Sequence, residues 1–156
     1  MKNQLKEVPL HGFFERSVSR KGRIQLPQEI ITQLNERGTR EFWVSPILRG
    51  AALVLYPADI WPEWLELARK NLPLMETERD ITGLTSLSKK KSLGSRGRLF
   101  LTPRMWRHAE IDPPCDAIIM GALERLEIWS LENQDTALHG CERLLISDND
   151  REGERI

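Results

Sequence analysis

The strongest constraint in this sequence is a short motif that occurs once in each half of the chain. Residues 21–27 read Lys-Gly-Arg-Ile-Gln-Leu-Pro, and residues 96–103 read Arg-Gly-Arg-Leu-Phe-Leu-Thr-Pro. Each copy has Gly-Arg, then an apolar-x-apolar triplet typical of a strand, then a proline, which favours the first turn of a helix. A repeated unit this small cannot bury its own apolar face, so we expect the two copies to pack on each other.

Two further strand-like runs follow each copy. They are residues 41–44 and 52–56 in the first half, and residues 117–120 and 126–129 in the second. A preceding strand is expected at 13–18, and Gly22 and Gly97 stand where a tight turn needs positive φ. The pattern predicts an α+β, mainly β fold in which each copy is strand, turn, strand, short helix, strand, turn, strand. Tyr56 and Trp129 hold matching places, which favours a packing role for both.

The segment between the copies, residues 58–91, is predicted to be a helical insert. Its first helix carries an apolar stripe and is ended by Pro73. The stripe consists of Ile60, Trp61, Trp64, Leu65 and Ala68. It has two readings, a cover for the chain's own sheet or a contact between subunits. A second helix is expected at about 76–87, with Lys89–Lys91 at its end, where lysines favour the negative end of the helix dipole.

These boundaries divide the chain into four parts. Residues 8–57 form the first repeat, 58–91 the insert, 92–131 the second repeat and 132–156 a polar, acidic tail. The tail has a weak helical pattern at about 137–146, and we expect residues 147–156 to be disordered because they are polar and charged.

Charge is segregated along the chain although the net charge is zero. Residues 81–109 contain seven Lys or Arg and no Asp or Glu, whereas residues 110–156 contain four and twelve. Such a distribution allows one basic face on a neutral molecule. No apolar run reaches membrane-spanning length and no signal peptide is recognisable, so we expect neither a membrane partner nor export. The two cysteines, Cys115 and Cys141, form no disulfide framework, which fits a reduced, cytoplasmic setting.

Basic residues gather at the two glycine turns. The candidates for binding double-stranded DNA are Arg20, Lys21, Arg23, Arg96 and Arg98. A guanidinium group in a turn can chelate guanine O6 and N7 in the major groove or clamp a phosphate. One basic turn would be explained by solubility alone. Two equivalent turns beside an acid-free stretch favour nucleic acid.

Catalytic motifs are missing from the sequence. There is no Gly-x-Ser-x-Gly, no phosphate-binding glycine loop and no His-Glu-x-x-His. His11, His108 and His139 have no ligand partners at useful spacing, and Cys115 has no neighbouring base. We therefore expect a protein that is not an enzyme and has no metal, no cofactor and no small-molecule substrate.

With these residues in place, the sequence resembles the MraZ family of bacterial transcriptional regulators of the division and cell-wall gene cluster. The matching segments are 19–27, 53–57, 96–103 and 126–129, and the resemblance covers roughly residues 10–131. It implies two SpoVT-AbrB-like swapped-hairpin (ββαββ) repeats packed as a pseudo-twofold unit. It also implies a DNA-binding repressor associated with the nucleoid, and ring-like homo-oligomers that bind tandem DNA repeats. The family role in DNA contact falls on Arg23 and Arg98.

One departure from the family pattern concerns the start of each turn. Family members open the turn with aspartate, whereas this chain has Ser19 and Gly94. Serine can still accept a hydrogen bond from a turn amide, and glycine cannot. The alternative function is therefore an assembly or protein-partner module that uses the same fold without binding DNA. Retention on heparin or nonspecific DNA would separate the two.

Overall fold

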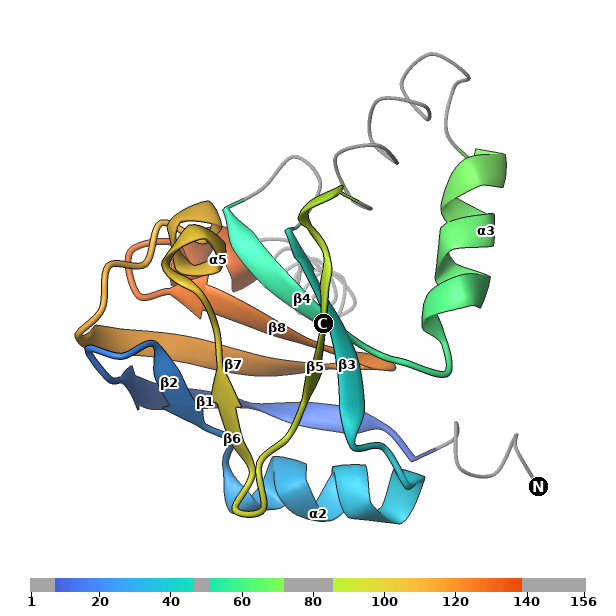
Figure 1. The fold of residues 1–156 in the computed structure, drawn as a ribbon, viewed down its shortest axis with the longest axis horizontal. Helices are drawn as coiled ribbons and strands as arrows, with labels where there is room; N and C mark the ends of the chain where they lie inside the picture. The colour runs from blue at the N-terminus through green and yellow to red at the C-terminus, as the bar shows by residue number, and fades with distance from the viewer. Residues whose placement is uncertain (1–7, 47–50, 72–85, 139–156) are drawn as a thin grey trace, which may run out of the picture.

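The computed structural model describes residues 8–46, 51–71 and 86–138, which form one eight-stranded antiparallel sheet with short helices (Figure 1). The mainly β prediction is confirmed. In the first half the elements are β1 (Leu10–Val18), β2 (Arg23–Gln25), α2 (Gln28–Arg37), β3 (Glu41–Pro46), β4 (Ala52–Pro57) and α3 (Trp61–Asn71). In the second half they are β5 (Lys89–Ser92), β6 (Arg98–Phe100), α5 (Pro103–His108), β7 (Cys115–Leu123) and β8 (Arg125–Ser130).

Strands from the two halves of the chain are interleaved in the sheet, mostly in pairs, and the strand order is β5-β3-β4-β8-β7-β1-β2-β6. The first strand before each glycine turn pairs with a strand of the other half: β1 with β7, from Leu10↔Leu123 to Val18↔Cys115, and β5 with β3. The short strands β2 and β6 pair with each other, as do β4 and β8. Neither half could therefore form its sheet without the other.

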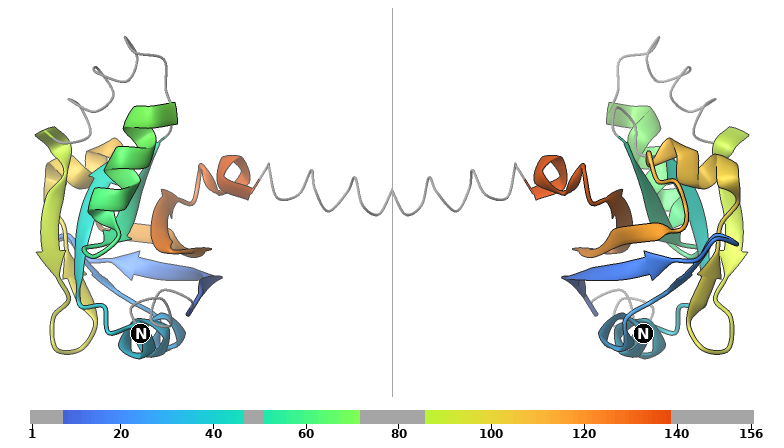
Figure 2. Two further views of the ribbon diagram at one scale, coloured as in Figure 1. Left: turned by 90° about the vertical axis from the view of Figure 1, so that its right-hand side faces the viewer. Right: turned by 90° about the vertical axis from the view of Figure 1, so that its left-hand side faces the viewer.

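The two ends of this strand order, β5 and β6, are consecutive in the chain and joined by the turn at 93–97. The sheet therefore curls, as Figure 2 shows from two sides, and its inner face packs around one apolar core. Alternate side chains of β1, β2 and β6 point into it, whereas β4 is buried along its whole length because its outer face is covered as well. The largest fully buried side chains are Trp106, Phe42, Leu10, Ile24, Leu26, Ile30, Leu34, Leu53, Leu55, Leu99 and Leu101.

The two glycine turns have the same backbone hydrogen bonds. In the first, the Gly22 amide donates to the Ser19 carbonyl at 2.9 Å, and in the second the Gly97 amide donates to the Gly94 carbonyl at 3.0 Å. Gly22 has φ of 85° and Gly97 has φ of 73°, so the prediction of positive φ at both is confirmed. Both positions suit glycine because other residues pay a steric cost in the left-handed region.

The predicted proline-led helices are confirmed. Pro27 precedes α2, which ends at Gly38 in the left-handed conformation, a common helix terminator. Thr102 caps α5, and its Oγ accepts a hydrogen bond from the Met105 amide at 3.4 Å. Pro103 follows at the first helical position, where its missing amide costs nothing.

The tryptophan stripe of α3 covers the outer face of β3 and β4. Trp61 is 6% exposed, and its ring stacks on Trp43 with centroids 5.5 Å apart. Trp64 lies 4.7 Å from the Tyr56 ring. This cluster supports the reading of the stripe as a cover for the chain's own sheet. The matching outer face on β7 and β8 holds Ile118 and Trp129, and residues 131–138 pack there.

One local prediction is wrong. Lys89–Lys91 do not end a helix; they form most of β5, where Lys91 pairs with Phe42. Only residues 86–87 are helical just before this strand, and the rest of the expected second helix lies outside the described residues. In the tail, residues 134–138 form a helical turn. The rest of the tail prediction concerns residues after 138, which also lie outside the described residues. Within the described part, no helix combines the length and apolar character needed to cross a bilayer.

We predict that alanine at Gly22 destabilises the protein more than alanine at Gly38. Both positions have positive φ, which costs a non-glycine residue about 1–2 kcal/mol. A Cβ at Gly22 would also lie 2.5 Å from the Leu101 carbonyl oxygen, whereas nothing lies within 4 Å at Gly38. Urea unfolding should therefore show a loss for Gly22→Ala at least about 1 kcal/mol larger than for Gly38→Ala. Equal losses would contradict the tight packing of the first turn.

The single tyrosine offers a second test, because Tyr56 is the only one in the chain. Burial raises the pKa of Tyr56 to about 12, while nearby Arg125 lowers it and Glu127 raises it. Folding thus favours the neutral phenol, and this stabilisation is complete below pH 10 and is lost as the pH rises towards 12. Absorbance at about 295 nm should show tyrosinate forming near pH 12 in the folded protein. A midpoint near 10 with the fold intact would contradict the burial.

Candidate nucleic-acid interface

The ladder between β2 and β6 carries two predicted arginines on its outer face. Arg23 lies opposite Phe100 and Gln25 opposite Arg98, and all four are exposed, whereas the central pair Ile24 and Leu99 is buried. Arg23 and Arg98 are therefore diagonal neighbours, a relation that places two residues about 7–8 Å apart, within reach of long side chains. The ladder brings together two guanidinium groups that are far apart in the sequence.

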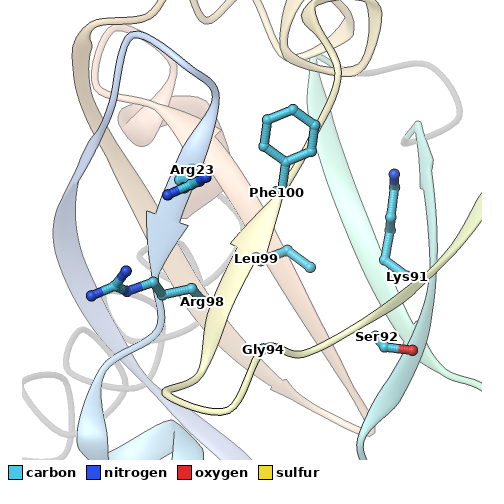
Figure 3. A pocket seen from close by; sticks show the side chains of 7 residues that line it. All are labelled: Arg23, Lys91, Ser92, Gly94, Arg98, Leu99 and Phe100. Carbon is cyan, nitrogen blue, oxygen red and sulfur yellow. The ribbon is translucent and has the colours of Figure 1, made fainter.

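Two grooves flank this ladder, and both arginines line both of them. The first has a volume of about 520 Å³ and is lined by Ser17, Ser19, Arg20, Lys21, Arg23, Ile24, Gln25 and Arg98. The second has a volume of about 320 Å³ and is lined by Arg23, Lys91, Ser92, Gly94, Arg98, Leu99 and Phe100 (Figure 3). Neither lining contains Asp or Glu, although Ser17 of the first groove donates a hydrogen bond to Asp116 just outside it at 2.8 Å, so both linings are basic.

The two linings consist largely of residues at matching places relative to the two glycine turns. Ser17 and Ser92 are each two positions before the turn, and Ser19 and Gly94 each open it. The match breaks at the last residue of each short strand, where Gln25 lines the first groove and Phe100 lines the second. The two halves of this surface have the same outline and different chemistry.

The other predicted residues are placed unequally. Arg20 and Lys21 are exposed in the first turn and line the first groove. Arg96 is exposed in the second turn but lines neither groove, and its carbonyl accepts a hydrogen bond from Gln25 Nε2 at 2.6 Å. Arg16, which precedes the first turn, lies with its guanidinium carbon 5.9 Å from the Phe14 ring centre.

None of the five predicted residues forms an ion pair with another residue in the described ranges. By contrast, Lys90 pairs with Glu41 at 3.4 Å and Arg125 with Glu127 at 3.1 Å. Exposed cations without protein partners keep their charge and their donors for an external anion. The face is thus equipped to bind a polyanion.

The two turns differ in one side-chain contact. Ser19 Oγ accepts a hydrogen bond from the Arg23 amide at 3.1 Å, and it therefore fixes the start of β2. Gly94 has no side chain to offer the Arg98 amide. A Cβ at Gly94 would meet only ordinary contacts, the nearest being the Arg98 carbonyl oxygen at 3.4 Å.

Three residues of the surface were missed by sequence reasoning: Gln25, Lys91 and Phe100. The period of two in a strand places Gln25 on the face of Arg23, and Phe100 on the face of Arg98. That signal was present in the two motifs. Lys91 carried no such signal, because its position depends on the pairing of β5 with a distant strand.

Other reactive groups do not add a second centre. Burial raises the pKa of the Cys115 thiol, a hydrogen bond with the Asp112 backbone lowers it, and the charges of Asp112 and Asp116 raise it. The net change in pKa is upward, which disfavours the reactive thiolate. Across the ranges that the structure describes, His, Cys, Asp and Glu side chains form no group of three that could hold a metal ion.

The relatives found by comparison with known proteins carry the same name. No family model matches the chain. A "Transcriptional regulator MraZ" of Limosilactobacillus reuteri is 33% identical over 127 residues, which cover 79% of this chain and 82% of that protein. The protein of the same name from Caldanaerobacter subterraneus is 29% identical over the same length, and that from Shewanella amazonensis is 24% identical over 140 residues, or 87% of this chain and 89% of that one.

The fold and its basic face define a mainly β protein with exposed cations gathered on one strand ladder. With relatives that match over most of both chains, the identification becomes more specific: this chain belongs to the MraZ family of transcriptional regulators. The resemblance drawn from the two glycine motifs is therefore confirmed. The family is non-enzymatic, which also confirms the prediction that the chain is not an enzyme.

We predict opposite effects for two substitutions at the openings of the turns. Ser19→Ala removes the hydrogen bond to the Arg23 amide and should cost about 0.5–1.5 kcal/mol. Gly94→Ser supplies the missing acceptor in an open position and should be neutral or stabilising by up to about 1 kcal/mol, in part because the unfolded chain loses freedom. Thermal or urea unfolding measures both. A destabilising Gly94→Ser would show that the two turns are not equivalent in backbone shape.

Proposed function

We propose that this protein is a sequence-specific regulator that binds double-stranded DNA and represses division and cell-wall genes. It would act in the cytoplasm, associated with the nucleoid, with Arg20, Lys21, Arg23, Arg96 and Arg98 as its DNA contacts. The observation that carries the proposal is the convergence of Arg23 and Arg98 on an acid-free face of the β2–β6 ladder.

The dimensions of this ladder suit a DNA groove. Two adjacent strands are about 5 Å apart, and the major groove of B-DNA is about 12 Å wide and admits a two-stranded ribbon. Arg23 and Arg98 start the two short strands, and a basic turn precedes each. The turns could then contact phosphates while the strand arginines contact base edges, a division of labour common in DNA recognition.

We further propose that two AbrB-like repeats with exchanged hairpins build the fold. The strand pairings are symmetric between the two halves: if each strand is replaced by its counterpart (β1 by β5, β2 by β6, β3 by β7, β4 by β8, and the reverse), the same pairs result. This holds when β5 and β6, which a turn joins, are counted as neighbours like β1 and β2. The repeats would span 8–57 and 92–131, with the insert 58–91 between them and the tail 132–156 after them. Because Lys89–Ser92 form β5, we move the start of the second repeat to Lys89.

Assembly is part of the same proposal. A ring-like homo-oligomer would present several copies of the β2–β6 face to tandem DNA repeats. Linked sites raise the apparent affinity through effective concentration, although each subunit makes only the contacts it already has. The partner-module alternative would use the Trp61/Trp64 stripe and the acidic tail as its working surfaces. It loses support at the stripe, because the Trp61 side chain is buried against the chain's own sheet.

Substitution of the two strand arginines tests the DNA proposal. Arg23→Ala and Arg98→Ala should each weaken binding to a duplex selected from random sequences by about 1–3 kcal/mol, the range for removing a contact to a base. The matched control is Arg69→Ala, which removes an exposed arginine from α3, a helix that covers β3 and β4 rather than the β2–β6 ladder. Fluorescence anisotropy measures all three.

The salt dependence should follow the same pattern. For every phosphate that a variant no longer neutralises, the slope of log K against log salt should become shallower by about 0.9. The circular dichroism of the variants should match that of the wild type, since both arginine side chains are exposed. Wild-type affinity in the double variant Arg23→Ala/Arg98→Ala would refute the site.

A further inference from the structure

The second groove contains an exposed aromatic ring that packing does not explain. Phe100 is 48% exposed, while its neighbour Leu99 on the same strand is fully buried. The ring lies between the two arginines of the ladder on one side and Lys91 across the groove (Figure 3). We propose that Phe100 is a specificity-determining residue that contacts the C5-methyl group of thymine in the bound duplex. This inference rests on the DNA-binding function proposed above.

The occupant of the groove follows from charge and shape. Three cations line it and no acid does, which matches a polyanion. Among the bases of duplex DNA, thymine alone presents a methyl group in the major groove, and apolar side chains, phenylalanine included, recognise it by contact. A phenyl ring held beside the two arginines proposed to contact base edges is thus placed for that methyl group rather than for a hydrogen-bonding edge.

The residue at the matching place in the first groove cannot do the same. Gln25 donates its side-chain amide to the Arg96 carbonyl at 2.6 Å and to the Leu26 carbonyl at 3.2 Å, so its donors are used within the protein. Gln25 therefore braces the second turn, and it offers no apolar surface comparable to a phenyl ring. The two grooves would contribute different sequence preferences, with the thymine contact confined to the groove of Phe100.

The experiment removes the methyl group from the DNA and the ring from the protein. The probe is a duplex enriched by the wild-type protein from a random-sequence pool, in which each thymine is replaced singly by deoxyuridine. This change deletes one methyl group and leaves base pairing intact. For the wild type, we expect replacement at one or two positions to weaken binding about fourfold, the equivalent of exposing one buried methyl group.

Variants assign that effect to the ring. Phe100→Ser should bind the thymine and deoxyuridine duplexes equally at those positions, whereas Phe100→Leu, which keeps an apolar side chain, should retain part of the difference. The matched control is Phe13→Ser, which removes an equally exposed phenylalanine, 44% exposed, from β1 outside both grooves. It should keep the full wild-type sensitivity.

The outcomes separate this inference from the function on which it rests. If the wild type binds an enriched duplex and no deoxyuridine position matters, the thymine contact is refuted and DNA binding stands. The same holds if Phe100→Ser remains as sensitive as the wild type. If no duplex is enriched and none binds at low salt, both the inference and the proposed function fail.

Discussion

Mutual docking of the two glycine turns is the contact on which the rest of the structure depends. The Gly22 carbonyl accepts hydrogen bonds from the Leu101 amide at 3.0 Å and from Trp106 Nε1 at 3.1 Å. In return, the Gly97 carbonyl accepts one from the Leu26 amide at 3.0 Å, and a Cβ at Gly97 would collide with Ile31. Each turn is thus seated beside the helix that follows the other turn. These bonds join segments more than 70 residues apart, and closing loops of that length costs entropy that only a shared core can offset.

The same docking sets the electrostatics of the basic face. Three cations, Arg23, Arg98 and Lys91, line one groove that contains no acid. Their proximity increases the electrostatic repulsion within the folded chain. Because Arg23 and Arg98 are exposed and Lys91 is partly exposed, physiological salt screens much of that repulsion over a Debye length of about 8 Å. The chain as a whole stays neutral because acids concentrate after residue 110. An uncompensated charge that folding itself does not need is the pattern expected of a surface retained for a polyanionic partner.

Much of this architecture could be predicted from the sequence because its signals are local. The positive φ of Gly22 and Gly97, the proline-led helices and the alternating strands each follow from a few neighbouring residues. The strand at Lys89–Lys91 could not be predicted in this way. Lysine has low strand propensity, and β5 exists because β3 offers it backbone partners, a tertiary contact that overrides local preference. For the same reason, the arginines could be named in advance while their convergence could not. It depends on the register of β2 against β6, which pairs two segments from opposite halves of the chain.

The differences between the two grooves bear on the kind of DNA site that such a surface would read. Identical halves would favour a palindromic sequence, because each half would apply the same chemistry to its own strand. Here the first half has the braced turn of Ser19 and a glutamine engaged within the protein. The second half has a turn opened by Gly94, which has no side chain to accept a hydrogen bond from the Arg98 amide, and it has the exposed ring of Phe100. Two grooves with matching lining positions but different side chains suit a directional, non-palindromic DNA site. Direct repeats of such a site present the same orientation to every copy, which is the arrangement that a ring of identical subunits can follow.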